Sequence, residues 1–306
     1  MVRVLVTGVG GPAGSSLSAQ LRTLGHWVLG VDMRPVPTSA ADSVAVVSPS
    51  ESPQYLWELR GLVATHGIQL LIPTVSDELV AVAAAREGFA PGVDVLISES
   101  GPVRLANDKY LTMNTLAAAG VAVPPFALPG DFASLHEAMA LMGGTLVVKP
   151  RVSRGGRGVQ ILERSADGSR AAADIWSALD DSWIVQRFAS GTEYAPVVHS
   201  AVPTSPDDLV VVLEKTELKG GRIGNAVSVK RVETASAADV ANQALAAVAA
   251  LGLSGPVDVD IRRLSDGRPV VLEVNARFGA NSAHAPELLA SVLYPYVHSP
   301  APAGTV

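Results

Sequence analysis

The sequence predicts an α/β amino-terminal part followed by a larger α+β part. Residues 3–98 alternate short apolar runs with segments of helical length, a pattern typical of a parallel sheet flanked by helices. Beyond residue 145, apolar runs are separated by glycine-containing turns, which indicates antiparallel hairpins. The 306 residues suffice for two domains, or for one domain with a lid.

Composition excludes several classes of protein. Hydrophobic residues make up 48% and charged residues 17%, as in packed globular proteins. The net charge of −6 argues against nucleic acid as the main partner, so an anion site must be a local group of Lys and Arg side chains. With 0 Cys, disulfides, thiolate catalysis and Cys-ligated zinc are excluded. The opening run MVRVLVTG is too short for a signal peptide and no apolar stretch reaches ~18 residues, so we expect a cytoplasmic protein with no membrane partner.

The amino-terminal part also contains a glycine-rich turn. Strands are expected at residues 2–6, 27–31, 43–47, 69–72 and 93–97, and helices at 12–24, 53–66 and 76–86. The turn from Gly8 to Gly14 fits G-x-G-x-x-A, and Asp32 ends the second strand, which suggests an NAD(P)-dependent oxidoreductase as an alternative function. Any tight strand-to-helix turn needs such glycines, however, and no Tyr-x-x-x-Lys pair follows.

The middle of the chain places basic residues beside a glycine-rich loop. A helix is expected from Asn107 to Ala119, capped by Asn107 or Asp108, followed by a helix over 132–142 and a strand over 145–150. Lys149 closes that apolar strand, so it either extends its head to solvent or serves a ligand. The loop over 151–158 can bring backbone amides close to phosphate oxygens, with Arg154 or Arg157 supplying charge; the alternative is a flexible basic turn.

The remaining elements are an antiparallel sheet with its helices. We expect helices at 170–179 and 237–251, and strands at 159–162, 183–188, 210–215 and 226–231. The last hairpin turns at Asp266-Gly267, so Ser265 should pair with Arg268. Its expected core face carries Val257, Val259, Ile261, Leu272, Val274 and Ala276.

The other face of this hairpin is acidic. The same register sets Asp260 opposite Glu273 and Asp258 opposite Asn275, with Arg277 just beyond. Like charges directly opposite on a sheet cost roughly 0.2–1 kcal/mol per pair. A divalent cation such as Mg²⁺ would remove this conflict by taking carboxylate oxygens together with substrate phosphates. The alternative is the solvated face of an ordinary hairpin.

Five motifs in series resemble those of the ATP-grasp superfamily of carboxylate–amine ligases. They are NDKYLT, TLVVKP, SRGGRGV, WIVQRFASGTEY and VLEVNARFG. The likeness covers nearly the whole chain and is strongest to the branch with the carbamoyl-phosphate synthetase large subunit and bacterial amino-acid ligases. It implies a Rossmann-like pre-ATP-grasp domain over 1–100, a lid-bearing subdomain with its linking helix over 101–187, and a carboxy-terminal subdomain with the Mg²⁺ site over 188–306.

The resemblance also implies roles for individual residues. Lys109 and Lys149 would contact ATP phosphates, and Arg277 would steady the transferred phosphoryl group. The lid loop would comprise Gly155, Gly156, Arg157 and Gly158. Gln186 would read the adenine edge and Glu193 the ribose hydroxyls, while the Mg²⁺ ligands would be Asp260, Glu273 and Asn275.

The implied reaction joins a small-molecule carboxylate to an amine. It uses ATP and Mg²⁺, with Mn²⁺ as an alternative, and passes through an acyl phosphate. The run Ala195-Pro196-Val197 lacks an acid that many relatives carry, which leaves a non-catalytic nucleotide-binding protein as a further alternative. A homodimer is the default assembly, because two-fold dimers are the commonest oligomers.

Overall fold

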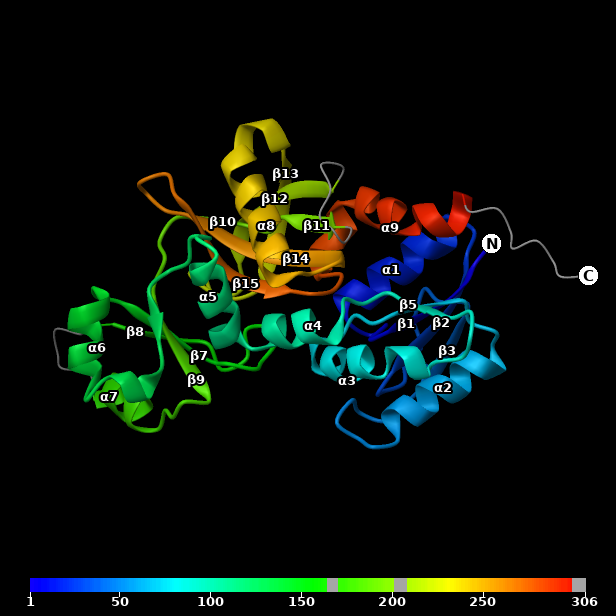
Figure 1. The fold of residues 1–306 in the computed structure, drawn as a ribbon, viewed down its shortest axis with the longest axis horizontal. Coiled ribbons are helices and arrows are strands. Elements are labelled where there is room, and N and C mark those ends of the chain that lie inside the picture. Colours follow the sequence, from blue (N-terminus) through cyan, green and yellow to red (C-terminus); the bar gives the residue numbers. More distant parts are fainter. Residues whose placement is uncertain (164–169, 201–207, 299–306) are drawn as a thin grey trace, which may run out of the picture.

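Three sheets organise the chain. The computed structural model describes residues 1–163, 170–200 and 208–298. In this part, a parallel sheet of β1–β5 and an antiparallel sheet of β10–β15 lie next to each other, and a smaller sheet containing β7, β8 and β9 lies at one end of the molecule (Figure 1). Helices α4 and α5 run between the first and the smaller sheet. No described helix has the length and apolar character needed to cross a bilayer.

The first sheet confirms the predicted parallel topology. Its strand order is β3-β2-β1-β4-β5, and every described pair is parallel. The strands are β1 (Arg3–Thr7), β2 (Trp27–Asp32), β3 (Ser43–Val46), β4 (Leu70–Ile72) and β5 (Asp94–Val95). The helices are α1 (Pro12–Thr23), α2 (Tyr55–Thr65) and α3 (Leu79–Ala84). The predicted helix over 76–86 is wrong in extent, because 3₁₀ turns at Ser76–Glu78 and Arg86–Gly88 flank a short α3.

Two helices follow where the sequence predicted one. They are α4 (Ser100–Asn107) and α5 (Lys109–Ala118). Asp108 separates them because its backbone is extended, with φ −101° and ψ 109°. Its side chain then caps α5 by accepting hydrogen bonds from the amides of Tyr110 and Leu111, at 2.9 and 3.2 Å. The predicted capping role of Asp108 is thus confirmed, whereas α4 was missed.

The smaller sheet is antiparallel and has the order β6-β9-β7-β8. Its strands are β6 (Phe126–Ala127), β7 (Leu146–Pro150), β8 (Gln160–Leu162) and β9 (Trp183–Arg187), with helices α6 (Leu135–Met142) and α7 (Arg170–Ser177). Helix α6 begins later than predicted, because Ser134 caps it after a 3₁₀ turn at Pro129–Asp131. Lys149 lies near the end of β7, as the sequence indicated.

The third sheet has six strands. They are β10 (Thr192–Tyr194), β11 (Val197–Ser200), β12 (Leu209–Leu218), β13 (Ala226–Val232), β14 (Gly255–Arg263) and β15 (Pro269–Asn275). Helix α8 (Ala238–Leu251) buries Val240, Val248 and Leu251 against the core, and α9 (Pro286–His298) follows a 3₁₀ turn at Ala280–His284.

The β14–β15 hairpin keeps the predicted acidic pairs but has a wider turn. Asp260 pairs with Glu273 as predicted. Near the turn, the Leu264 amide donates to the Arg268 carbonyl at 2.9 Å, so the loop has three residues and the predicted Ser265–Arg268 pair is wrong. Gly267 accepts the left-handed conformation that this turn requires, with φ +87°.

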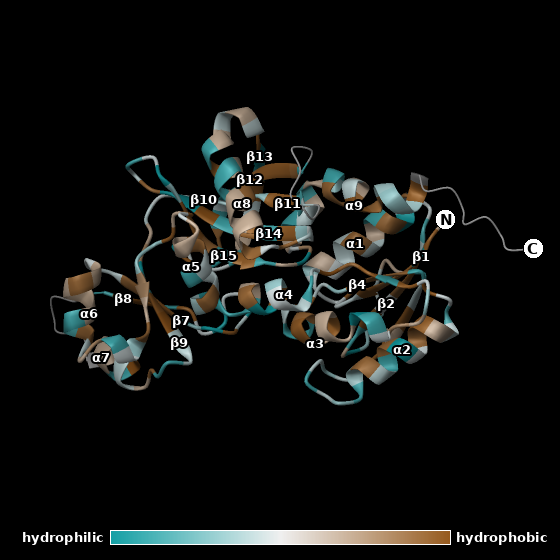
Figure 2. Ribbon diagram, in the orientation of Figure 1, coloured by the Kyte–Doolittle hydropathy of each residue, from teal (hydrophilic) through white to brown (hydrophobic). Residues whose placement is uncertain are grey.

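A β-bulge at Leu272 restores the register. Ile261 pairs with Val271 while Asp260 pairs with Glu273, so Leu272 is the additional residue on β15. Leu272 was predicted to lie in the core, and this is wrong: it lines a cavity, and Val271 is buried instead. Figure 2 shows the hydrophobic colouring of the hairpin strands below their hydrophilic turn.

The buried apolar side chains form three clusters. One apolar cluster joins Leu5 of the first sheet to Val257 of the third, and a second joins Val4 to Val197. A third cluster lies within the smaller sheet and its helices, around Met139. The first and third sheets therefore share cores, whereas the smaller sheet has a core of its own and contributes Ile184 of β9 to the first cluster.

Candidate active site

Most of the predicted site residues meet between the smaller sheet and the six-stranded sheet. A cavity of about 110 Å³ is lined there by Lys149, Gln186, Glu193, Lys215, Asp260 and Glu273. Glu273 also lines an adjoining cavity of about 20 Å³, which Lys109 and Asn275 share. These are polar and charged groups in a partly enclosed space, the usual character of a ligand site.

The carboxylates converge because of strand pairing. Asp260 and Glu273 are direct partners on β14 and β15, and their side chains remain about one quarter exposed. Asn275 lies two residues beyond Glu273, on the same face of its strand. Among the described residues, no group of three or more His, Cys, Asp or Glu side chains could hold a metal ion by itself. The oxygen donors nevertheless suit Mg²⁺, which usually takes one or two carboxylates and completes its shell with substrate phosphate and water.

Two buried lysines face this acidic edge. The Lys149 ammonium donates to the Leu272 carbonyl at 3.1 Å, a carbonyl on the β-bulge. The Lys109 ammonium donates to the Ser153 carbonyl at 2.7 Å and lies 3.6 Å from a Glu273 carboxylate oxygen. Burial lowers the pKa of Lys149 to about 8, despite the attraction of Glu273. A charged Lys149 is therefore costly until an anion arrives beside it.

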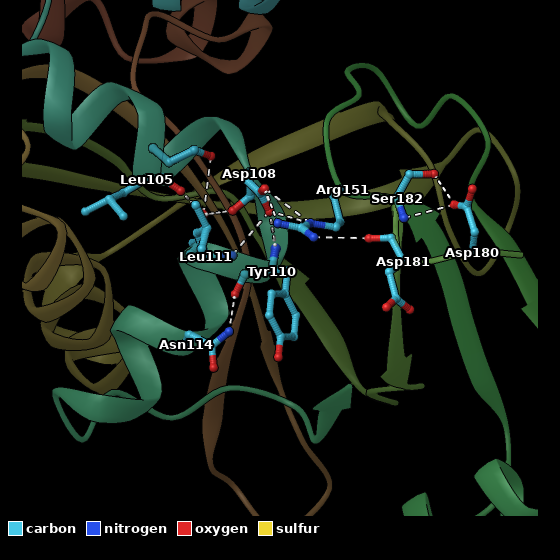
Figure 3. A network of polar contacts seen from close by, with 11 residues as sticks. Leu105, Asp108, Tyr110, Leu111, Asn114, Arg151, Asp180, Asp181 and Ser182 are labelled. Carbon is cyan, nitrogen blue, oxygen red and sulfur yellow. Dashed lines mark hydrogen bonds and ion pairs between the residues drawn. The ribbon is translucent and has the colours of Figure 1, made fainter. Parts of the chain in front are cut away.

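A polar network fixes Lys109 relative to β7. Figure 3 shows the Arg151 guanidinium directed at the Asp108 carboxylate that caps α5, with a closest contact of 2.6 Å. Arg151 also donates to the Asp181 carbonyl at 3.1 Å, and the Lys109 amide donates to the Arg151 carbonyl at 2.9 Å. Burial opposes ionisation of Asp108, but the hydrogen bonds from Arg151 and from backbone amides outweigh it and lower the pKa of this carboxyl.

Lys215 and Arg262 complete the site. The Lys215 ammonium lies 2.7 Å from Glu193 and 2.6 Å from Asp260, and its side chain is 5% exposed. Burial opposes its charge, but the two carboxylates prevail and raise the pKa of Lys215. Arg262 binds the other Glu193 oxygen at 2.6 Å. The sequence singled out neither Lys215 nor Arg262, although Arg262 shares the strand face of Asp260 by its two-residue spacing.

Gln186 is buried in the wall of the cavity. It lies on β9, and its side chain is 3% exposed. Within the described residues, its amide nitrogen has no hydrogen-bond partner. A buried donor without a partner costs about 1–3 kcal/mol, so this position favours a ligand that offers an acceptor.

The glycine-rich loop reaches two different cavities. Gly155, Gly156 and Gly158 have φ of +61°, +72° and +75°, which favours glycine at each position. Gly156 lines the cavity described above and approaches the β12–β13 turn at Gly224. Arg157 instead lines a separate cavity above the first sheet, where Arg154 forms an ion pair with Asp77.

Arg277 lies beside the predicted metal ligands. It donates to the Asn275 side-chain oxygen at 3.2 Å and to the Ser76 hydroxyl at 3.1 Å. Asp258 is buried nearby and contacts Asn281 at 3.3 Å. Burial, reinforced by Asp260, raises the pKa of Asp258 to about 6. A Cβ on Gly279 would lie 1.5 Å from an Asp258 oxygen, so this carboxylate needs the glycine.

The amino-terminal glycine turn is held by its own acid. Both Asp32 carboxylate oxygens accept backbone hydrogen bonds, from Gly10 at 2.9 Å and from Arg34 at 3.2 Å. A Cβ on Gly14 would lie 2.5 Å from the Gly8 carbonyl oxygen, so close packing of the helix on the strand requires this glycine. These contacts account for the fingerprint through packing and turn geometry, without a dinucleotide.

Comparison with known proteins identifies the family. The family model described as "ATP-grasp domain" matches residues 106–281. Cyanophycin synthetase from Trichormus variabilis is 36% identical over 97 residues, which cover 31% of this chain and 11% of that protein. Formate-dependent phosphoribosylglycinamide formyltransferase from Hahella chejuensis is 30% identical over 169 residues, which cover 53% of this chain and 39% of that protein. The matches thus span well under half of each curated relative.

Solved structures show the same fold at low sequence identity. An L-amino acid ligase from Bacillus licheniformis gives a TM-score of 0.67 at 18% identity, covering 93% of this chain and 69% of that one. The biotin carboxylase domain of 2-oxoglutarate carboxylase from Hydrogenobacter thermophilus, a dimer in complex with MgADP, ADP and bicarbonate, gives 0.71 at 13% identity, covering 99% and 71%. The family model spans more than half of the chain and includes the lysines, the glycine-rich loop and the acidic hairpin, so the protein belongs to the ATP-grasp family.

Proposed function

We propose that this protein is an ATP-dependent carboxylate–amine ligase. A substrate carboxylate oxygen attacks the γ-phosphorus of ATP, which forms an acyl phosphate and releases ADP. An amine then attacks the acyl carbon, phosphate leaves, and an amide results. The observation that carries the proposal is the convergence of Lys149, Asp260 and Glu273 in one partly buried cavity beside Lys109 and Arg277.

Charge placement supports the roles of the cationic side chains. Lys109 and Lys149 hold the phosphates, and a bound phosphate offsets the burial penalty that lowers the Lys149 pKa. Arg277 is held by Asn275 and Ser76 and stabilises charge on the transferred phosphoryl group. Gly155, Gly156 and Gly158 let the loop backbone approach the phosphates.

The nucleoside end of ATP fits the opposite wall. Gln186 offers its unpartnered amide nitrogen to the adenine ring. Glu193 accepts hydrogen bonds from the ribose hydroxyls on the oxygens that Lys215 and Arg262 now contact. These hydrogen-bonding groups support an adenine nucleotide as the ligand of the pocket.

Asp260, Glu273 and Asn275 would hold Mg²⁺, and Mn²⁺ is the alternative ion because it accepts the same oxygen ligands. The ion would supply charge neutralisation across the phosphates. Lys215 sets the orientation of the Asp260 carboxylate through the 2.6 Å contact between them.

The proposed domains are a Rossmann-like pre-ATP-grasp domain over 1–100, a lid-bearing subdomain over 101–187 and a carboxy-terminal subdomain over 188–306. The separate apolar cluster around Met139 supports independent movement of the smaller sheet. A cavity of about 110 Å³ is smaller than the ~300–1,000 Å³ usual for ligand pockets. ATP would therefore require the glycine-rich loop to move away from the β12–β13 turn. The partners are a small carboxylate, a small amine and, by default, a second copy of the chain.

A matrix of carboxylates and amines, scored for phosphate release and for product mass, tests the proposal. We expect one combination to release ADP and phosphate in step with an amide, and Glu273→Gln to lower kcat/KM by at least 10²-fold, a loss of about 3 kcal/mol in transition-state stabilisation. Glu217→Gln is the matched control, because Glu217 lies exposed on β12. MgATP binding without turnover of any pair would favour the non-catalytic alternative, and undiminished turnover by Glu273→Gln would contradict the assigned site.

A further inference from the structure

Arg262 is a buried arginine in the wall of the nucleotide cavity, which is the cavity of about 110 Å³ described above. It lies on β14 directly opposite Glu193 of β10, so strand pairing brings the two side chains together. A buried guanidinium is tolerated only when acceptors satisfy its N–H groups and an acid offsets its charge. The groups that Arg262 contacts therefore show which parts of the site it holds in place.

The Arg262 guanidinium joins three segments of the chain. Its Nε donates to Glu193 Oε2 at 2.8 Å, and its Nη2 lies 2.6 Å from the same oxygen. Its Nη1 donates at 2.6 Å to the carbonyl of Ala189, in the connection between β9 and β10. Its Nη2 also donates to the carbonyl of Arg222, in the β12–β13 turn. All three nitrogens have partners within the protein, so Arg262 acts through its neighbours and not by binding a ligand itself.

An aromatic ring packs against this guanidinium. The Arg262 guanidinium carbon lies 5.1 Å from the centroid of the Phe188 ring, and that of Arg222 lies 4.5 Å from the same centroid. Both distances lie within the range of cation–π attraction. Arg222 also forms an ion pair at 2.6 Å with Glu163, the residue after β8. These contacts restrain the guanidinium, and they restrain the Glu193 carboxylate that it holds.

Two cations divide the oxygens of Glu193 between them. The Lys215 ammonium donates to Oε1 at 2.7 Å, whereas Arg262 occupies Oε2. Among the described residues, Lys215 is the one hydrogen-bond partner of Oε1. Each carboxylate oxygen has about two lone-pair positions, so Oε1 can still accept one hydrogen bond. Contacts on both oxygens oppose rotation of the carboxylate and keep this acceptor position fixed.

We propose that Arg262 is a positioning residue that fixes the Glu193 carboxylate to accept a hydrogen bond from a ribose hydroxyl of the nucleotide. Without Arg262, Glu193 is held by Lys215 alone and can rotate, so the hydroxyl loses a preorganised acceptor. A nucleotide that lacks this hydroxyl makes no such contact and is insensitive to the loss. The role of Arg262 rests on the proposed function, in which Glu193 contacts the ribose.

The test measures how strongly the full chain distinguishes ribose from deoxyribose. Calorimetry gives the Kd values of ADP, 2′-deoxy-ADP and 3′-deoxy-ADP in the presence of Mg²⁺, and the selectivity factor is the Kd of a deoxynucleotide divided by that of ADP. We expect a factor of about ten or more in the wild type for at least one deoxynucleotide, because the hydroxyl donates to a charged acceptor. Arg262→Met should lower this factor to below about three, chiefly by weakening ADP. Arg263→Met is the matched control, because Arg263 is the next residue on β14 and pairs with Asp239, so the factor should not change.

Two further variants separate positioning from a general loss of structure. Glu193→Gln should also lower the factor, because a neutral amide is a weaker acceptor than a carboxylate. Adding Arg262→Met to Glu193→Gln should lower it no further, since Arg262 acts through Glu193. Arg262→Lys keeps the positive charge but not the planar fork, so its factor should lie between those of the wild type and Arg262→Met. This variant decides the question if Arg262→Met does not fold.

The possible results distinguish this role from the proposed function. If Arg262→Met weakens ADP and both deoxynucleotides equally, or if Arg262→Lys keeps the full factor, the positioning role is refuted while the proposed function stands. A wild type that binds all three nucleotides equally would refute ribose recognition by Glu193, and with it the role of Arg262, but not the use of ATP. If the wild type does not bind MgADP, the proposed function itself fails, and the role of Arg262 fails with it.

Discussion

Replacing Lys149 by Met should stabilise the protein while abolishing its use of nucleotide. Lys149 is 6% exposed, and burial lowers its pKa from 10.5 to about 8. That shift means that the buried charge lowers the free energy of unfolding by about 3 kcal/mol at pH 7. The hydrogen bond from Lys149 to the Leu272 carbonyl, worth about 1 kcal/mol, is lost in the variant. We therefore expect the free energy of unfolding of Lys149→Met to be about 2 kcal/mol higher than that of the wild type.

The pH dependence separates this explanation from better packing alone. Between pH 8 and 10.5 the folded wild type binds fewer protons at Lys149 than the unfolded chain, so its stability rises with pH in this window. Below pH 8 both states are protonated and the penalty is fully present. The advantage of Lys149→Met should thus be largest at pH 7, shrink above pH 8 and vanish before pH 10.5, where the lost hydrogen bond leaves the variant slightly less stable than the wild type.

Urea unfolding at pH 7 and at alkaline pH measures the two free energies. Lys230→Met is the control, because Lys230 lies 59% exposed on β13 and its loss should change stability by less than about 0.5 kcal/mol. MgADP should raise the unfolding free energy of the wild type and not that of Lys149→Met. A variant that is less stable than the wild type at pH 7, or whose advantage persists at high pH, refutes the reasoning.

Three further variants test the surroundings of the site. Gly279→Ala should destabilise the protein by roughly 1–3 kcal/mol, because its Cβ would lie 1.5 Å from Asp258; a double-mutant cycle with Asp258→Ala should show strong non-additivity, and additive effects would exclude the clash. Asp258→Asn should be about 1–3 kcal/mol more stable at pH 7, because a folded pKa near 6 makes the wild type lose stability as pH rises from 3.8 to 6; parallel pH profiles of the two proteins would contradict this. Arg151→Gln should weaken MgADP binding about tenfold by releasing Asp108 and displacing Lys109, with the fold intact by circular dichroism; unchanged affinity would show that the network does not position this lysine.

Much of the site could be predicted from the alternation of side chains along the strands. The side chains of a strand alternate between faces, so the acidic pair of Asp260 and Glu273 could be set on one face by counting from a turn. The count gave the right pairs although the turn is one residue longer than expected, because the bulge at Leu272 compensates for it. The length of a turn and the site of a bulge depend on backbone angles that the pattern of apolar residues does not specify.

Contacts between residues far apart in the chain could not be predicted from the sequence. The ion pairs of Lys215 with Glu193 and Asp260 arise because β10 pairs with both β12 and β14, an order that no local pattern encodes. Likewise, the turn after β4 meets Arg277 because the first and third sheets share a core. By itself the sequence determined the strand faces, the lysine at the end of β7 and the glycine-rich loop, since these follow from local periodicity and backbone freedom. Only the tertiary structure decided which charges neutralise one another and which cavity Arg157 lines, because those depend on contacts between residues far apart in the chain.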